Sequence, residues 1–109
     1  MKKANTLKKN KDFSYCYRRG KKYRSDIIGM YVAASKYNVR AGFCVSKKVG
    51  NAVTRNLIRR RLKECLTPYI CEINKNCSIV IVANDTVVNA SYQKICSEVE
   101  RLLKIARVL

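Results

Sequence analysis

The chain has 109 residues, of which 24 are Lys or Arg, 7 are Asp or Glu and none is His, so its formal net charge at pH 7 is +17. This length fits one domain with a single core. The charge excess predicts a polyanionic partner, of which nucleic acid fits best, bound in a salt-dependent way. The lack of histidine removes the commonest general base and excludes Ser-His and Cys-His nucleophile schemes.

No segment of the sequence has the features of a membrane protein. The longest apolar run, Ile79 to Ala83, is far too short to span a bilayer, and the amino terminus has no apolar signal-peptide core. An anionic membrane surface is the rival polyanion, but the basic segment described below lacks the Trp, Phe and Leu face of an interfacial helix. We therefore expect a cytoplasmic protein with no membrane partner.

The six cysteines do not form a recognisable metal or disulfide pattern. They contain no C-x-x-C pair, and the chain has no histidine to complete a zinc finger. Several fall on apolar faces, where Cys behaves as a small hydrophobe, and a reducing cytosol keeps thiols free. We expect core filling, with no metal bound, of Cys16, Cys44, Cys65, Cys71, Cys77 and Cys96.

The amino-terminal part is predicted to contain an arm and a short helix. Residues 1–9 are polar and basic and are predicted to form a flexible arm. A helix is expected to follow, with Asn10 as its cap and Gly20 as its stop. Phe13 and Tyr17 lie four residues apart and so share one face, where core packing is the usual interpretation of an aromatic pair.

Two strands are predicted next, over Ile27–Ala34 and Val39–Ser46, because side chains alternate in character with a period of two. Lys21–Arg24 is interpreted as a basic connector and Ser35–Asn38 as a turn, so that the two strands form a hairpin. The residues alone leave Tyr31 open as either a core or a cleft residue.

A second helix is predicted from about Ala52, after a turn at Lys47–Gly50. Gly50 can take a positive backbone angle there, and Asn51 can cap the helix. At about 100° per residue, one side of this helix is apolar and the opposite side is polar and basic. The apolar side carries Ile58, Leu62, Cys65 and Tyr69, and the opposite side carries Asn56, Arg59, Arg60 and Lys63.

The basic side of this helix has no acidic residue near it. Seven basic residues and no Asp or Glu lie between Lys47 and Lys63. Arg55, Arg59 and Lys63 are spaced four apart, so their like charges repel by roughly 0.2–0.5 kcal/mol per pair. A solvated helix face is the usual explanation of a basic run, but the lack of interleaved acid favours a surface that binds a polyanion.

A strand and a helix complete the chain. Pro68 ends or distorts the basic helix, and Cys77–Ala83 is rich enough in β-branched residues to predict a strand buried on both faces. Strand, helix and strand then form a crossover unit, which is right-handed in nearly all proteins. Apolar residues at helical spacing from Tyr92 to Ala106 predict a last helix that covers the sheet, with Ser91 as its cap.

The central stretch resembles the signature of the bacterial ribonuclease P protein component. It reads Val49-x-x-Ala52-x-x-Arg55-Asn56-x-x-Arg59-Arg60-x-x-Lys63, preceded by Gly42-Phe43-x-Val45-Ser46-Lys47-Lys48. The chain departs from the family at Arg59, where Lys is usual, at Lys63, where Arg is frequent, and at Thr6, where Arg is frequent. The charge is kept at 59 and 63, although Lys does not reproduce the bidentate phosphate contact of Arg.

The resemblance implies an α+β fold over a single domain, residues 1–109. The expected architecture is a four-stranded mixed sheet with three helices, of the ribosomal protein S5 domain 2-like type. Its βαβ crossover is left-handed in the family, against the general preference.

The resemblance also implies a function. The family removes the 5′ leader of precursor tRNA, in a Mg²⁺-dependent endonucleolytic reaction performed by a catalytic RNA that holds most of the metal. We expect a monomeric protein, 1:1 with that RNA, with no catalytic residue of its own. Contacts to the catalytic RNA are expected from Lys47, Lys48, Arg55, Asn56, Arg59, Arg60 and Lys63, and contacts to the leader from Phe13, Tyr17 and Tyr31.

Two other functions share some of these sequence features. A ribosomal or other structural RNA-binding protein would share the charge and the fold, but would not require this Arg-Asn-x-x-Arg-Arg spacing. A protein nuclease would need metal-binding carboxylates brought together, and the basic region is followed only by the single acid Glu64.

Overall fold

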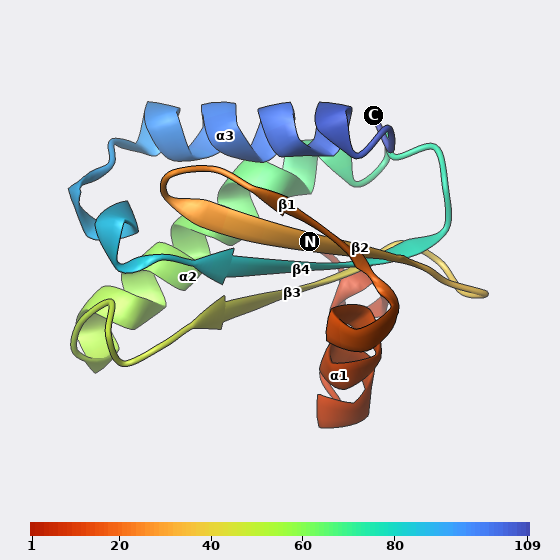
Figure 1. The fold of residues 1–109 in the computed structure, drawn as a ribbon, viewed down its shortest axis with the longest axis horizontal. Coiled ribbons are helices and arrows are strands. Elements are labelled where there is room, and N and C mark those ends of the chain that lie inside the picture. Colours follow the sequence, from red (N-terminus) through yellow and green to blue (C-terminus); the bar gives the residue numbers. More distant parts are fainter.

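The computed structural model describes all of residues 1–109. The chain forms three α-helices and four strands, together with short 3-10 turns (Figure 1). In order, the elements are η1 (Lys3–Asn5), α1 (Asn10–Arg19), β1 (Lys21–Arg24), β2 (Ile28–Ala34), β3 (Arg40–Val45), α2 (Ala52–Leu66), η2 (Thr67–Tyr69), β4 (Cys77–Ala83), η3 (Asp85–Asn89) and α3 (Tyr92–Ile105).

The four strands form one mixed sheet in the order β1-β2-β4-β3. β4 pairs with β2 in the antiparallel sense and with β3 in the parallel sense, so that Ile81 lies between Met30 and Phe43. The predicted hairpin of β2 with β3 is therefore wrong. The β-branched run of β4 is buried on both faces and takes the central place, which separates the two strands that follow one another in sequence.

The segment Lys21–Arg24, predicted to be a connector, is the edge strand β1. Its side chains carry no apolar alternation that could have revealed a strand, because this strand contributes only Tyr23 to the core. Charged side chains are common on edge strands, since they discourage pairing with other chains. The fourth strand therefore lies in a segment without periodic apolar residues.

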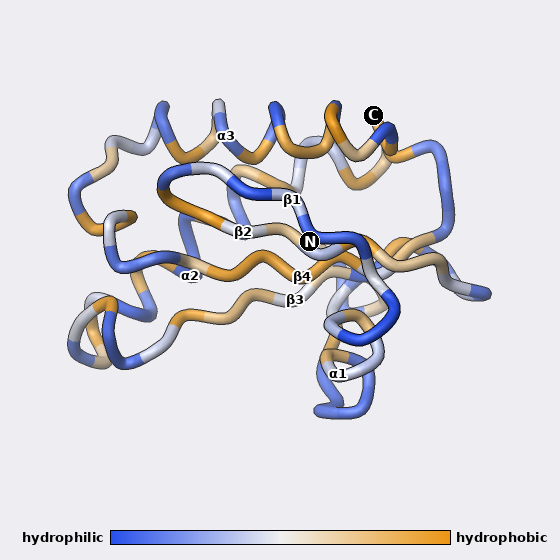
Figure 2. The backbone as a smooth tube through the Cα atoms, viewed as in Figure 1, coloured by the Kyte–Doolittle hydropathy of each residue, from blue (hydrophilic) through white to orange (hydrophobic).

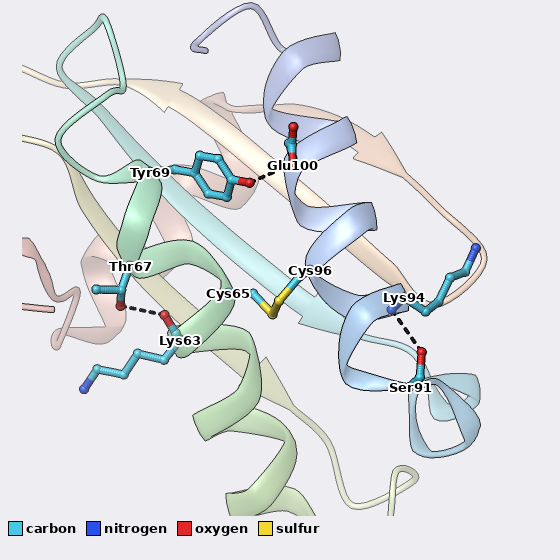
Figure 3. The surroundings of a disulfide bond; sticks show 8 residues. All are labelled: Lys63, Cys65, Thr67, Tyr69, Ser91, Lys94, Cys96 and Glu100. Atoms are coloured by element: carbon cyan, nitrogen blue, oxygen red, sulfur yellow. Dashed lines mark hydrogen bonds between the residues drawn. A yellow bond between two sulfur atoms is a disulfide. The ribbon is translucent and has the colours of Figure 1, made fainter.

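The crossover from β3 through α2 to β4 is left-handed, as the resemblance implies. In Figure 1, β3 and β4 point in the same direction, β4 lies above β3, and α2 passes behind them. Figure 3 shows the sheet from the side that α2 covers, with β3 and β4 running toward the lower right. When this view is turned so that the two strands point upward, β4 lies to the left of β3, which is the left-handed arrangement. The general preference for right-handed crossovers would have predicted the opposite.

Helices α2 and α3 cover one face of the sheet and form the main core with it. This core is a cluster of 21 buried residues, in which Met30 and Ile81 of the sheet are accompanied by Leu62 of α2 and Leu102 of α3. Figure 2 shows the apolar colour along β4 and on the side of α3 that faces the sheet. The predicted covering role of the last helix is confirmed. None of the helices is long and apolar enough to cross a membrane.

Helix α1 lies alone on the other face and crosses the strands. Its middle residue Cys16 is fully buried, and its sulfur lies 3.5 Å from the carbonyl oxygen of Tyr31 and 3.4 Å from that of Ser78. At its end, a Cβ on Gly20 would lie 2.4 Å from the carbonyl oxygen of Cys16 and 3.2 Å from the backbone of Val32, so only glycine allows this close approach. One short helix leaves the open face of the sheet only partly covered.

The predicted caps of the two longer helices are confirmed. The side-chain oxygen of Asn51 accepts a hydrogen bond from the Thr54 amide at 2.9 Å, and that of Ser91 accepts one from the Lys94 amide at 3.1 Å. Asn10 is instead the first residue of its helix, where no side chain caps the end. Gly50 does not have the positive φ that was predicted for the turn.

The amino-terminal segment is packed, which corrects the prediction of a flexible arm over residues 1–9. Leu7 is 4% exposed and its amide donates to the carbonyl oxygen of Ala41 at 2.9 Å. Thr6 forms a parallel bridge with Ala41, and the side chain of Asn5 donates to the carbonyl oxygen of Val39 at 2.7 Å. The free edge of β3 supplies the backbone partners, and one apolar residue is enough to anchor the segment there.

Two of the six cysteines are joined, a pairing that the sequence spacing did not indicate. Cys65 at the end of α2 and Cys96 in α3 form a disulfide between the two helices (Figure 3). Cys16 and Cys77 fill the core as predicted, and burial raises the pKa of each thiol to about 11. Cys71 is exposed, so core filling does not extend to all six.

Candidate nucleic-acid interface

Aromatic side chains of α1, together with residues of the edge strand β3, line a depression beside α1. Phe13 and Tyr17 come from successive turns of α1, and Phe43 and Cys44 come from β3. The depression has a volume of about 360 Å³. We call it the aromatic groove. The predicted leader residues Phe13 and Tyr17 are therefore brought together on one surface, and core packing alone does not describe them.

Tyr31, the third predicted leader residue, stands beside the aromatic groove on β2. Its ring centroid is 4.9 Å from that of Tyr17, and the two rings are nearly perpendicular at 86°, which is a favourable edge-to-face geometry. The ammonium of Lys22 lies 5.2 Å from the centroid of the Tyr31 ring, within the range of a cation–π contact. A cation thus sits next to the exposed aromatic surface.

The phenol of Tyr17 is held to the neighbouring strand. Its oxygen lies 2.8 Å from the sulfur of Cys44. Burial, and then the hydrogen bond with Cys44, raise the pKa of Tyr17 above its usual range. The phenol therefore stays neutral at all pH values near neutrality, and the ring presents an uncharged face to a ligand. Tyr17 is still 39% exposed, which leaves that face accessible.

Phe13 is positioned by close contact with a glycine of β3. A Cβ on Gly42 would lie 2.3 Å from the end of the Phe13 ring and 3.2 Å from the Cβ of Leu7. The ring therefore lies directly on the strand backbone. In the Gly42-Phe43 pair of the sequence motif, Gly42 makes room for the Phe13 ring, whereas Phe43 packs against the main core and borders the groove at the edge of the sheet.

The basic side of α2 borders the aromatic groove. Arg59 and Lys63 line a smaller hollow of about 190 Å³ together with Phe13 and Phe43. The two sets of residues predicted from the sequence, one basic and one aromatic, therefore meet at Phe13, beside Phe43. This continuity could not be deduced from helical spacing, because it depends on how α1, β3 and α2 pack.

The remaining predicted basic residues differ in their surroundings. Arg59 donates from Nη1 to the side-chain oxygen of Asn56 at 2.8 Å, which fixes both side chains on the outer surface of α2. Arg60 is exposed and lies 3.8 Å from a carboxylate oxygen of Glu64, a pair that contributes little in water. Arg55 is half-buried, and its Nε is buried without a hydrogen-bond partner.

Lys47 and Lys48 lie in the turn between β3 and α2, where both are exposed. Lys48 does not face the aromatic groove. It lines a separate hollow of about 410 Å³ with Asp26 and Asp85. The predicted RNA-binding set is therefore a strip that extends from this turn along α2 and meets the groove only at Arg59 and Lys63.

Sequence reasoning missed two residues of this surface. Phe43 shares its strand face with Val39, Ala41 and Val45 and packs against the main core, as the alternation predicted, but β3 is an edge strand, so the half-buried residue also borders the groove. Lys22 was assigned to a connector. Its place over Tyr31 follows from the pairing of Lys22 with Tyr31 across β1 and β2. Both depend on the sheet order, which no local pattern indicates.

The acidic residues do not form a site. No three His, Cys, Asp or Glu side chains are placed so that they could hold a metal ion. Most of the carboxylates are instead engaged in ion pairs with Lys or Arg: Asp12, Asp26, Glu64, Glu98 and Glu100. The arrangement offers cations and aromatic rings, which suit binding of nucleic acid rather than general acid–base chemistry.

Comparison with known proteins agrees with this arrangement. The family model for ribonuclease P matches residues 1–107. The chain belongs to the ribonuclease P protein family. It is 36% identical over 108 residues to the ribonuclease P protein component of Clostridium botulinum, with 97% of both chains covered. It is 38% identical over 105 residues to that of Alkaliphilus oremlandii, with 95% of this chain and 92% of the other covered.

Solved ribonuclease P proteins have the same fold. A Staphylococcus aureus RNase P protein, a mutant with defective mRNA degradation activity, aligns with a TM-score of 0.91 at 33% identity over 98% of this chain and 92% of the other. The Thermotoga maritima protein aligns with a TM-score of 0.81 at 21% identity over 90% and 96%. As a ribonuclease P protein component, the chain is part of an endoribonuclease holoenzyme and partners an RNA subunit in tRNA processing.

Proposed function

We propose that this protein binds the catalytic RNA of ribonuclease P through α2 and holds the 5′ leader of precursor tRNA in the aromatic groove. The observation that carries the proposal is the contact between the two surfaces. Arg59 and Lys63 share one hollow with Phe13 and Phe43. A protein that must hold two RNAs against each other needs two RNA-binding surfaces that meet, and here they do.

The groove suits a leader of any sequence. Aromatic faces stack on every base, at about 1–3 kcal/mol per base, without reading its edges. Phe13 and Tyr17 provide such faces, and Tyr31 with Lys22 provides a ring with a cation above it. Leader sequences that differ between tRNA precursors can therefore be held by the same residues.

The basic strip suits the phosphates of the catalytic RNA. Arg60 and Lys63 are exposed and Arg55 is half-buried, so they can offer guanidinium and ammonium donors to phosphate oxygens, and Asn56 positions Arg59. Two RNAs that approach each other repel, and the protein's charge of +17 lowers that repulsion. In this proposal Mg²⁺ is held mainly by the RNA and supplies the chemistry of phosphodiester cleavage there. The protein acts in the cytoplasm as one copy per RNA.

The test is cleavage of a precursor tRNA at low Mg²⁺ by the protein alone, a bacterial ribonuclease P RNA alone, and both together. We expect cleavage in the mixture only. Cleavage by the protein alone would place the catalyst in the chain, and absence of cleavage in all tubes would reduce the function to general RNA binding. Replacement of Asp12, Asp26, Glu64 or Asp85 one at a time should change the rate by less than about ten-fold, since removing a true general acid or base costs about 10²–10⁴-fold.

A further inference from the structure

A second hollow lies on the same face of the sheet, on the opposite side of α1 from the aromatic groove. It has a volume of about 550 Å³ and is lined chiefly by Lys11, Tyr15, Ser35, Lys36, Tyr37 and Arg40. We call it the Tyr37 hollow. Helix α1 crosses the sheet at Cys16, so that Phe43 and Cys44 fall on one side of the helix and Arg40 and Ser78 on the other.

The Tyr37 hollow contains a cation held against an aromatic ring. The guanidinium carbon of Arg40 is 5.3 Å from the centroid of the Tyr37 ring, and Nη1 lies 3.7 Å from a carboxylate oxygen of Asp12. The Nε of Arg40 is buried without a hydrogen-bond partner. Arg40 is thus fixed from two sides. It covers one face of Tyr37, and the tyrosine is still 66% exposed, so its other face is open to solvent.

The turn that carries Tyr37 is anchored at several points. The Tyr37 amide donates to the side-chain oxygen of Ser35 at 3.1 Å, and the Ser35 amide donates to the carbonyl oxygen of Asn76 at 3.1 Å. The side chain of Asn38 donates to the carbonyl oxygen of Ala4 at 2.8 Å. An exposed aromatic ring on a fixed turn loses little conformational entropy when a ligand stacks on it.

The charges around the ring favour an anionic ligand. Lys11 and Lys36 line the Tyr37 hollow, are exposed and take part in none of the ion pairs of the structure. Asp12 is the single carboxylate among the lining residues, and Arg40 already neutralises it. Two free ammonium groups beside an open ring match the chemistry of a nucleotide, whose phosphates bind cations and whose base stacks on an aromatic face.

We infer that the Tyr37 hollow is a second binding site for single-stranded RNA, with one base stacked on Tyr37 and the adjoining phosphates bound by Lys11 and Lys36. This extends the proposed function, because the site lies outside the aromatic groove and is separated from it by α1. The strand has two possible sources, which share this chemistry: a distal part of the leader or a single-stranded segment of the RNA subunit.

The first test measures the affinity of the whole protein for a fluorescein-labelled oligouridylate by anisotropy. Tyr37→Ala should weaken binding by about five-fold or more, the lower end of what one stacked base contributes. Tyr37→Phe should keep wild-type affinity, because the ring is retained. The matched control is Tyr92→Ala, at a tyrosine of α3 that is 41% exposed and lies on the helix-covered side.

Unchanged affinity of Tyr37→Ala would overturn the inference, as would an equal loss in Tyr37→Phe or in Tyr92→Ala. Lys36→Gln should also lower the slope of log affinity against log salt by about one, the loss of one phosphate contact. If an acidic peptide displaces the oligouridylate from wild type and Tyr37→Ala alike, the hollow is an anion site for a protein partner instead, and the inference fails.

The second test separates the two sources and separates this inference from the proposed function. Reconstituted holoenzyme is assayed for binding of precursor tRNAs with a long and a short leader. If Tyr37→Ala weakens binding of the long-leader precursor only, the bound strand is the distal leader. If it weakens binding of both precursors, the bound strand belongs to the RNA subunit. No effect with either overturns the inference. Phe13→Ala reports on the aromatic groove in parallel, so a loss confined to Phe13→Ala leaves the proposed function standing alone.

Discussion

The phenol oxygen of Tyr17 lies 2.8 Å from the sulfur of Cys44, which joins the only helix on the open face of the sheet to the edge strand β3. The same tyrosine meets Tyr31 of β2 at a centroid distance of 4.9 Å. One side chain of α1 therefore contacts both β3 and β2, and α1 is held across the sheet by an aromatic residue as well as by the buried Cys16.

The ring of Tyr17, rather than its hydroxyl, should determine leader affinity. Tyr17→Ala is expected to weaken binding of a leader-bearing precursor tRNA to the holoenzyme by about five-fold or more, while Tyr17→Phe stays near wild type, since stacking needs the ring. Because the pKa of Tyr17 is raised by burial and by its bond with Cys44, this residue should add no pH dependence near neutrality. Mature tRNA without a leader is the control, and an equal loss for it would contradict the prediction.

Gly42→Ala should displace Phe13. The new Cβ would lie 2.3 Å from the ring, and overpacking of this kind costs about 1–3 kcal/mol in the free energy of unfolding. Leader affinity should fall with it, because the ring moves off the strand. Gly29→Ala is the matched control, since its Cβ would meet nothing closer than Lys22 Cε at 3.5 Å. Urea unfolding and binding of leader-bearing precursor measure both effects, and equal behaviour of the two variants would refute the prediction.

Arg60→Ala should weaken assembly with the RNA subunit, most visibly at low Mg²⁺, where fewer divalent ions screen the RNA. Loss of one phosphate contact is expected to reduce the salt slope of log affinity by about one. Lys75→Ala removes the same charge from an exposed position in the link before β4 and serves as the control. Equal assembly of both variants with the RNA subunit at every Mg²⁺ concentration would exclude α2 as the contact.

Reduction of the disulfide should lower the free energy of unfolding without changing the RNA-binding surface. Cys65 and Cys96 are 31 residues apart, and closing a loop of this size is worth about 3–4 kcal/mol in the chain-entropy account. Urea unfolding with and without dithiothreitol measures the difference. Cys71→Ser, at an exposed free thiol, should leave stability unchanged, and an oxidised and a reduced protein of equal stability would show that the crosslink contributes nothing.

Low pH should lower the free energy of unfolding by protonating Glu98 of α3. Hydrogen bonds from Lys94 at 2.7 Å and Arg101 at 2.7 Å lower the pKa of this carboxyl. A lowered folded-state pKa means that its contribution to stability is present above the unfolded value of about 4.3 and is lost as the pH falls through the folded value. Glu98→Gln should therefore be less stable than wild type at pH 7 and approach it at low pH. A pH-independent difference in urea unfolding would contradict this.

The sequence by itself determined the helices and strands whose apolar residues recur with a clear period, and it showed the basic face of α2. Helices α2 and α3, the strand Cys77–Ala83 and the caps Asn51 and Ser91 follow from local spacing. Local spacing suffices there because a helix or a buried strand imposes its own periodicity on apolar residues. The basic face of α2 is visible for the same reason, and its motif identified the family before any contact was known.

Only the tertiary structure decided which elements are neighbours. The place of β4 between β2 and β3, the strand β1, the anchored Leu7 and the Cys65–Cys96 bond all depend on contacts between distant residues. No local pattern encodes such contacts, because each is fixed by how the whole chain buries its apolar surface and pairs its backbone groups. The meeting of Arg59 with Phe43, and the fixed turn that presents Tyr37, are consequences of that packing.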